Sequence, residues 1–377
     1  MAASALADRD AWLRLANTPG IGAVTVERLL ARFGHPQAIV DASDQALKEA
    51  GVSAPARAAL AEADPAYLAA ARDWLAADAS HHFITRDEAR FPAALADLDP
   101  VPPWLYGLGD LDLLDTPAIA IVGSRNPSHA GRAAAKEFGQ ALATAGFVVV
   151  SGLASGIDAA AHEGALAARG MTIAVTGTGL DRVYPAANRH LAREIAESGL
   201  LVSEFPLGTQ PARANFPRRN RIIAGLSVAT LVVEAARASG SLITARLASS
   251  AGREVFAMPG SIHNPLARGC HQLIRDGAKL VETTEHIIEE IAAVLPGYHR
   301  EHVSSAQADS DEANEGRNAA PTAADPLLEA VGFDPVRLDT LVARTGWRAD
   351  EVSSRLLILE LEGRIKTVAG GRYVRNS

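Results

Sequence analysis

Four arginines crowd one short stretch of this sequence: Arg213, Arg218, Arg219 and Arg221. No acidic residue stands between them. A guanidinium group is a planar fork of N–H donors that matches the oxygens of a phosphate or a carboxylate. A basic run is usually only a solvated surface, but this one leads directly into the apolar residues 222–226, which must pack against a core. The stretch therefore predicts arginines that are held at a defined place and suited to binding an anion.

Two turns rich in small residues could add backbone donors to such a site. Residues 123–128 (Gly-Ser-Arg-Asn-Pro-Ser) and 151–158 (Ser-Gly-Leu-Ala-Ser-Gly-Ile-Asp) each follow an apolar run and precede a segment compatible with a helix. The first N–H groups of a helix have no partner within it and attract anions. Neither turn has the glycine spacing of a dinucleotide fingerprint or a phosphate loop, and one such turn alone could merely relieve crowding at a strand end. Two of them, with Arg125 in the first, favour phosphate binding.

Apolar runs that alternate with helical segments form the frame for these turns. The runs are residues 118–122, 147–150, 171–176, 200–203, 228–234, 254–257 and 279–281. This alternation predicts an α/β fold with a mostly parallel sheet, in which the turns that follow the strands meet at one edge. We expect residues 83–111 to form an irregular connector that packs Trp104 and Tyr106 onto the sheet.

The chain has 377 residues, a net charge of −8 and one cysteine, Cys270. Its length predicts two or three domains. No apolar run reaches the length of a membrane span, and the N-terminus lacks a signal pattern. A single cysteine excludes an internal disulfide framework, so we expect a cytoplasmic protein. The net charge does not indicate a nucleic-acid-binding protein, but binding depends on where the charges lie.

Residues 1–80 are rich in Ala and Leu and predict an all-α N-terminal domain. Within it, residues 19–22 (Pro-Gly-Ile-Gly) separate two helical segments. They resemble the turn of a helix-hairpin-helix, whose backbone amides contact a DNA phosphate. An ordinary helical turn with glycine caps would contain the same residues, and both interpretations stay open.

The C-terminal part predicts a linker followed by a small domain. Residues 297–325 are polar and have the composition of a flexible linker. Residues 326–377 predict three helices and a hairpin, as in a winged-helix domain. The third helix, near residues 350–361, exposes acidic side chains, whereas the hairpin is basic. Because an acidic helix suits the DNA major groove poorly, we expect contact with a protein or an auxiliary role in DNA binding.

Together, the motifs resemble the DNA-processing protein A family (DprA, also called Smf). The matching residues are 123–128, 151–158, 177–181 with 184–185, 216–227, 234 with 239–245, 259–261, and 269–274 with 277–278. Cys270 and His271 depart from the family pattern, in which the second of these two positions is more often Asn. The resemblance covers about residues 83–291, and it is specific because many motifs occur in the family's order.

The resemblance implies an extended Rossmann-like core, at residues 81–296, that forms a homodimer. Such proteins bind incoming single-stranded DNA in natural transformation, protect it and load RecA recombinase onto it, without an established catalytic activity or a cofactor. The implied DNA-binding residues are Gly123, Ser124, Arg125, Ser128, Ser151, Gly152, Gly156, Arg218, Arg219, Asn220, Arg221, Gly240, Ser241 and Thr244. Asp158 and Glu234 are expected to orient these groups. The implied dimer interface contains Ile262, Leu266, Leu273 and Ile274.

An enzyme that acts on a nucleotide is the main alternative. Lysine-decarboxylase-like phosphoribohydrolases have a related sheet, but their Pro-Gly-Gly-x-Gly-Thr signature is missing from this sequence. A transcription regulator with a ligand-sensing core is a second alternative, and the acidic third helix of the winged-helix domain argues against it. The sequence also has no His/Cys metal spacing and no nucleophile–base arrangement.

Overall fold

The computed structural model describes residues 2–62, 65–262, 264–292, 325–331 and 335–376. It divides into two compact units, residues 1–303 and residues 304–377. Nearly all of the expected linker, residues 297–324, lies outside the described residues. None of the described helices is long and apolar enough to cross a membrane.

The N-terminal region is helical, as predicted. Its described helices are α1 (Ala2–Asn17), α2 (Ala23–Phe33), α3 (Pro36–Val40), α4 (Asp44–Glu49), α5 (Ala54–Ala61) and α6 (Pro65–Ala77). Apolar side chains such as Trp12 and Val26 form a core between these helices. The same core includes Trp104 of the sheet, whose ring centroid lies 6.1 Å from that of Trp12. The helices are therefore packed directly on the sheet.

A nine-stranded sheet forms the centre of the first unit, in the order β1-β2-β6-β5-β4-β3-β7-β8-β9. The strands are β1 (His81–Thr85), β2 (Trp104–Gly109), β3 (Ala118–Val122), β4 (Val148–Ser151), β5 (Thr172–Val175), β6 (Leu200–Ser203), β7 (Ala229–Val232), β8 (Glu254–Ala257) and β9 (Lys279–Leu280). In this order the strands β6, β5, β4, β3, β7, β8 and β9 are all parallel. At one edge of the sheet, β2 pairs in antiparallel fashion with both β6 and β1. The predicted α/β class with a mostly parallel sheet is confirmed.

The expectation of an irregular connector at residues 83–111 is wrong, because it contains most of β1 and all of β2. Pro100, Pro102 and Pro103 directly before β2 obscured the strand pattern, since proline is depleted in strands. Trp104 and Tyr106 lie in β2 and are buried. They pack against the N-terminal helices as well as the sheet.

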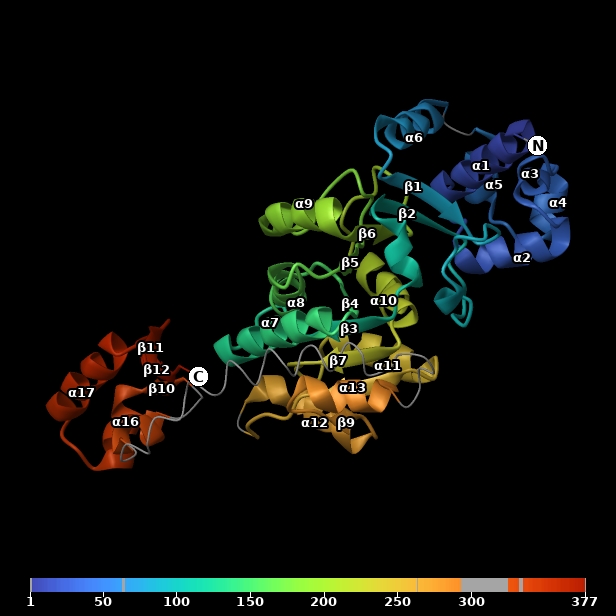
Figure 1. Cartoon of the computed structure of the whole chain (residues 1–377). Coiled ribbons are helices and arrows are strands. Elements are labelled where there is room, and N and C mark those ends of the chain that lie inside the picture. Colours follow the sequence, from blue (N-terminus) through green and yellow to red (C-terminus); the bar gives the residue numbers. More distant parts are fainter. Residues whose placement is uncertain (1, 63–64, 263, 293–324, 332–334, 377) are drawn as a thin grey trace. The chain divides into compact units, whose positions relative to one another are not determined.

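Helices cover both faces of the parallel strands (Figure 1). One face carries α7 (His129–Thr144), α8 (Ile157–Ala167), α9 (Arg189–Ser198) and α13 (Thr284–Ala292). The other carries α10 (Asn215–Leu226), α11 (Ser241–Ser250) and α12 (Arg268–Arg275). Buried strands such as β3 (Ala-Ile-Ala-Ile-Val) are apolar on both faces because each face packs against a helical layer.

The order of the strands reverses between β3 and β7. From β3 the chain proceeds to β4, β5 and β6 on one side, and then returns to place β7 on the other side of β3. Connections that leave in opposite directions open a crevice at the carboxyl ends of the two strands, which is where open α/β sheets bind ligands. The turn after β3, residues 123–128, and the loop after β7, residues 233–240, border this crevice.

The second unit is the winged-helix domain that the sequence predicted. Its elements are α15 (Pro326–Val331), β10 (Val336–Arg337), α16 (Leu338–Thr345), α17 (Ala349–Leu361), β11 (Ile365–Val368) and β12 (Arg372–Arg375). The hairpin of β11 and β12 gains a third strand, the short β10, which the sequence analysis missed. Leu327, Val352, Leu356 and Leu359 form the core of this unit.

Candidate nucleic-acid interface

The carboxyl ends of β3 and β7 border a groove of about 790 Å³, which we call the central groove. Its walls are the loops after these strands and the first turns of α10 and α11. The predicted site residues that line it are Gly123, Ser124, Arg125, Asp158, Arg219, Asn220, Gly240, Ser241 and Thr244. The fold thus brings residues from four separate sequence motifs into one site.

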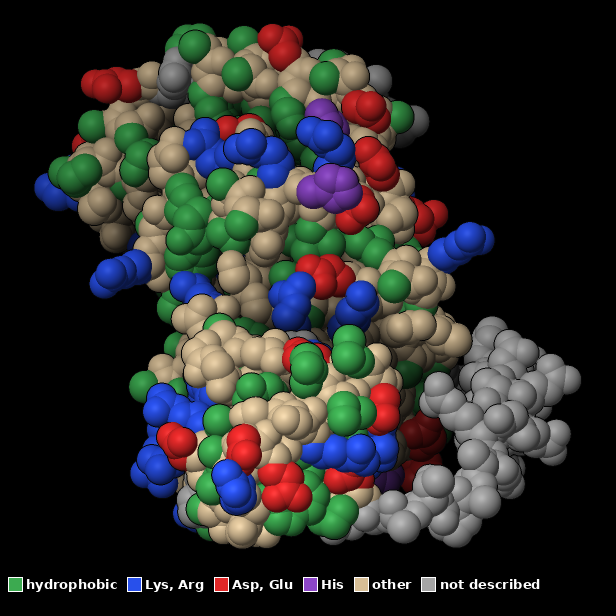
Figure 2. All heavy atoms as spheres, turned by 90° about the vertical axis from the view of Figure 1, so that its left-hand side faces the viewer, with side chains coloured by type: hydrophobic (Ala, Val, Ile, Leu, Met, Phe, Trp, Pro, Cys, Tyr) green, Lys and Arg blue, Asp and Glu red, His purple; other side chains and the backbone are tan. Residues whose placement is uncertain are grey.

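Arg125 and Arg213 supply accessible positive charge to the central groove. Both side chains are exposed, and neither forms an ion pair with a described residue. The Arg125 guanidinium carbon lies 5.1 Å from the ring centroid of Phe216, where the negative face of the ring attracts it. Figure 2 shows acidic, basic and hydrophobic side chains interspersed over the face that it draws. Arg125 and Arg213 are thus exposed charges of the central groove that an anion could neutralise.

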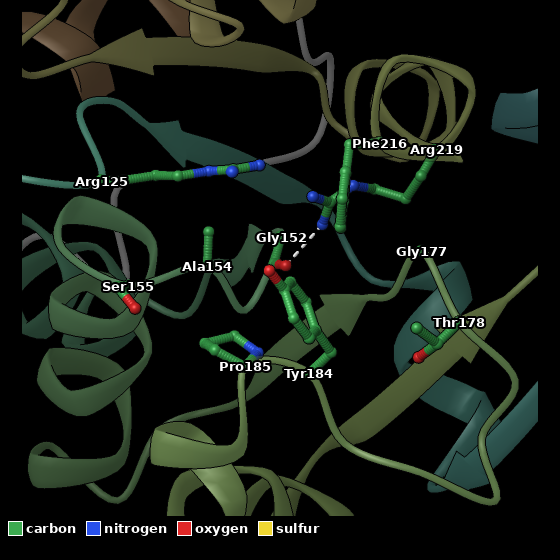
Figure 3. A pocket seen from close by; sticks show the side chains of 10 residues that line it. All are labelled: Arg125, Gly152, Ala154, Ser155, Gly177, Thr178, Tyr184, Pro185, Phe216 and Arg219. Atoms are coloured by element: carbon green, nitrogen blue, oxygen red, sulfur yellow. Dashed lines mark hydrogen bonds between the residues drawn. The ribbon is translucent and has the colours of Figure 1, made fainter. Parts of the chain in front are cut away.

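Two aromatic side chains border a small cavity of about 60 Å³, the inner pocket, beside the central groove. The rings of Tyr184 and Phe216 lie 5.6 Å apart and are tilted by 33°. Figure 3 shows both rings and Arg125 directed toward the same space. Neither aromatic residue is among the predicted site residues, although both lie in stretches that resemble the motifs of the family, residues 184–185 and 216–227.

Arg219 is buried beneath the central groove, with 4 % of its surface exposed. Its Nη1 donates to the backbone carbonyls of Gly152 and Val175 (Figure 3 marks the first of these bonds). Burial lowers the pKa of Arg219 to about 10, so that the side chain stays charged at neutral pH. The structure therefore places Arg219 beneath the groove and not on its rim, with Nη1 bridging two strand ends and Nε buried without a hydrogen-bond partner among the described residues.

Asp158 is buried at the start of α8, next to this arginine. Its Oδ2 accepts hydrogen bonds from the N–H groups of Gly152, at 3.2 Å, and Ala154, at 3.4 Å. Burial raises the pKa of Asp158, while the positive charge of Arg219 acts in the opposite direction. The amide of Gly152, which the sequence analysis assigned to phosphate, is consequently turned inward to this carboxylate.

Gly156 allows the two turns to approach each other. Its φ of +85° belongs to the left-handed region, and a Cβ there would collide with the carbonyl oxygens of Ser124 and Arg125. The N–H of Ile157 donates to the Ser124 carbonyl at 3.1 Å. This contact fixes the backbone that carries Arg125.

The serines predicted to contact DNA mostly satisfy internal partners. Ser128 caps α7 and donates to Glu234, and Ser151 donates to the carbonyl of Ile121 at 2.6 Å. Ser241 is 8 % exposed, and its hydroxyl shares a hydrogen bond of 2.7 Å with that of Ser239. Of these three serines only Ser241 lines the central groove, and the hydroxyl groups of all three have partners within the protein.

The other members of the basic stretch point in different directions. Arg221 pairs with Glu204 and donates to the carbonyl of Pro100, so its charge is neutralised. Asn220 donates to the carbonyl of Gly240 at 3.3 Å and joins α10 to the loop before α11. Arg218 is exposed and lies outside the central groove, over the ring of Phe205.

The four residues of the expected dimer interface differ in exposure. Ile262 is 73 % exposed, Leu266 and Ile274 are half-buried, and Leu273 is buried in the core of the sheet. Only Ile262 presents most of its side chain to solvent. Leu273 is 9 % exposed, so it would offer little surface to a partner.

The site suits the binding of an anion that also carries flat rings whose faces are free to stack. Exposed guanidinium groups attract phosphates, and the rings of Tyr184 and Phe216 offer surfaces for stacking. Within the described residues, no three His, Cys, Asp or Glu side chains gather as metal ligands.

Family models match three successive parts of the chain. The models are "DprA-like N-terminal HHH domain" at residues 6–66, "DNA recombination-mediator protein A" at residues 82–292 and "DprA winged helix domain" at residues 311–371. Protein Smf of Escherichia coli is 38 % identical over 98 % of this chain and 96 % of its own length.

Two solved structures share the fold of the first unit. DNA processing protein A of Streptococcus pneumoniae is 37 % identical, with a TM-score of 0.66 over 74 % of this chain and 97 % of its own. The Helicobacter pylori protein, whose structure addresses its single-stranded DNA binding mode, is 32 % identical, with a TM-score of 0.52 over 57 % of this chain and 98 % of its own. Sequence, domain order and fold agree: the chain belongs to the DNA recombination-mediator protein A (DprA/Smf) family.

Proposed function

We propose that this protein binds single-stranded DNA in the central groove and acts as a non-catalytic recombination mediator. The observation that carries the proposal is the placement of exposed Arg125 against Phe216, with Tyr184 beside them. Cations and aromatic faces around one groove suit a polyanion whose bases are free to stack. In a duplex the base faces are already stacked, so single strands gain more from this site.

The biological setting follows from the family. As a DprA/Smf member, the protein would act in the cytoplasm on incoming single strands of natural transformation, protect them from nucleases and load RecA recombinase onto them. We propose that it works as a homodimer. We also propose domains at residues 1–80, 81–296 and 326–377, joined by a linker at residues 297–325.

The test is fluorescence anisotropy of the full chain with a labelled oligo-dT, in competition with unlabelled duplex DNA and with free nucleotides. We expect the unlabelled single strand to compete far better than the duplex or any nucleotide. Stronger competition by a nucleotide would instead support the phosphoribohydrolase alternative. A second assay would measure RecA filament assembly on the bound oligonucleotide, which the protein should accelerate.

A further inference from the structure

A second groove, of about 460 Å³, lies between the N-terminal helices and the sheet. We call it the hairpin groove. One wall is the turn between α1 and α2, residues 17–22, and the other is the loop after β6, residues 204–209. Arg218 lines it from the first turn of α10. The central groove uses neither wall.

Arg218 is held in this groove without an anionic partner. Its guanidinium carbon lies 5.3 Å from the ring centroid of Phe205. One of its terminal nitrogens, Nη2, would lie 3.6 Å from a Cβ added to Gly22. No described carboxylate pairs with Arg218, unlike its neighbour Arg221. The side chain is therefore directed at the turn, with its charge unused.

The turn that Arg218 faces presents free backbone donors. Gly22 is the N-cap of α2 and offers no side chain to cap it. Ile21 donates its N–H to the carbonyl of Thr18, but the N–H groups of Gly20, Gly22 and Ala23 donate to no residue that the structure describes. The positive end of a helix thus faces a guanidinium group, an arrangement that an anion between them would stabilise.

Glu204 also lines the hairpin groove but does not pair with Arg218. It is 5 % exposed and forms its ion pair with Arg221 through Oε1. Its Oε2 is buried and accepts no hydrogen bond from a described residue, so this oxygen is not presented to a ligand in the groove. A nucleotide would therefore be held through its phosphate, by Arg218 and the backbone amides of the turn.

The first turn of α10 connects the two grooves. Pro217 and Asn220 line the central groove, whereas Arg218 lines the hairpin groove. We propose that the hairpin groove is a second nucleotide-binding segment, which holds the part of the same DNA strand next to the part in the central groove. This inference rests on the proposed function, since it extends the path of the strand that the central groove binds.

Gly22 allows a sharp test, because its φ of −116° and ψ of −175° are ordinary for an N-cap and accessible to any residue. In Gly22→Asp the carboxylate would cap α2 and lie beside Arg218, and so occupy the place of the phosphate without harming the fold. Gly22→Asn would cap the helix without the charge. Arg218→Ala removes the cation, and Arg193→Ala on α9 removes an exposed charge from the opposite helical layer.

The measurement is anisotropy on the full chain with oligo-dT of about 4 and about 20 nucleotides, at several salt concentrations. For the long oligonucleotide we expect Gly22→Asp to weaken binding about tenfold and Arg218→Ala to flatten the log–log salt dependence by about 0.7. Gly22→Asn should have a smaller effect, and Arg193→Ala none. For the short oligonucleotide, which fits within the central groove, all four variants should match the wild type. The melting temperature of Gly22→Asp should be unchanged or raised.

Two outcomes would overturn the second segment. One is unchanged binding of the long oligonucleotide by both Gly22→Asp and Arg218→Ala; the other is an equal loss for the two lengths. The proposed function fails separately, if Arg125→Ala leaves both lengths unaffected. Weakening by Arg125→Ala together with wild-type behaviour of Gly22→Asp would keep the central groove and reject only the hairpin groove.

Discussion

Both donor groups of Ser128 donate to the carboxylate of Glu234: its backbone N–H at 2.8 Å and its hydroxyl at 2.6 Å. Ser128 is the N-cap residue before α7, and Glu234 follows β7, so the contact joins the two sides of the crevice. The Ser128 hydroxyl also accepts the N–H of Gly131 and thereby caps the helix. One residue pair therefore fixes the relative position of the loops that border the central groove.

Ser128→Ala should destabilise the fold with little direct effect on DNA affinity. It removes the N-cap of α7 and the hydroxyl donor to the nearly buried Glu234 carboxylate, which keeps the backbone N–H of residue 128 and the amide of Asn264 as donors; the two losses together cost about 1 to 2 kcal/mol. Urea denaturation would measure the change in the free energy of unfolding. Ser128→Thr keeps the hydroxyl and is the matched control. Equal stability of the Ala variant and the wild type would show that the pair contributes nothing.

The alternation of strand and helix was sufficient to predict the parallel sheet and to place both turns at its carboxyl edge. It could not tell which arginine faces the groove. Arg218 and Arg219 are neighbours on α10, about 100° apart around the helix, so one is exposed and the other buried. Which is which depends on how α10 packs against the sheet, and that rotation leaves no mark in a run of basic residues. Phe216 escaped notice because its role depends on the distant Tyr184.

Buried His162 should make stability depend on pH. Its Nδ1 lies 2.7 Å from the hydroxyl of Thr172, which donates its own proton to the carbonyl of Val149, so Nδ1 carries the proton of a neutral ring. Burial lowers the pKa of His162 from 6.5 to about 3. Between these values the unfolded chain binds a proton that the folded chain does not, so stability falls as the pH falls below about 6.5.

The loss attributable to His162 should be on the order of 3 kcal/mol by about pH 4. His162→Asn keeps a donor near the position of Nδ1 but cannot titrate, so its stability should vary less over this range. Denaturation of both proteins at a series of pH values would test this, because other titrating groups affect both alike. Parallel stability curves would show that His162 does not contribute.

Ile262 is the residue through which the proposed homodimer can be tested most simply. It is 73 % exposed and precedes η4 (Pro265–Ala267) and α12. A two-fold contact that buries an isoleucine cannot accept a charge there. We expect light scattering to show a dimer for the wild type and a folded monomer for Ile262→Glu. Val24 on α2 is similarly apolar and 64 % exposed, so Val24→Glu serves as the control and should remain dimeric. A wild-type monomer at high micromolar concentration would end the dimer proposal.

Phe216→Ala should weaken binding of oligo-dT by about 1 to 3 kcal/mol if one base stacks on its ring. The change removes no charge, so the salt dependence of the affinity should stay close to that of the wild type. Phe216→Tyr keeps the ring and should bind nearly as well. Anisotropy titrations at two salt concentrations separate the two effects. An unaltered affinity of Phe216→Ala would remove the inner pocket from the DNA site.

Arg125→Ala should have the complementary signature. The side chain is exposed in the central groove and free of ion pairs with described residues, so it is available to neutralise one phosphate. A single strand loses a log–log slope of about 0.7 for each phosphate contact removed, so the slope should flatten by about that amount. Phosphates carry no base information, and oligo-dT, oligo-dA and oligo-dC should therefore be weakened alike.

The Arg125 variant should be weakened rather than inactive, because Arg213 remains in the groove. Part of its effect should come from Phe216, which loses the cation over its ring, so the Arg125→Ala and Phe216→Ala effects should not be additive. Arg193→Ala, which removes an exposed charge from α9, controls for net charge. A well-folded Arg125→Ala protein with the affinity and salt slope of the wild type would refute the central groove as the DNA site.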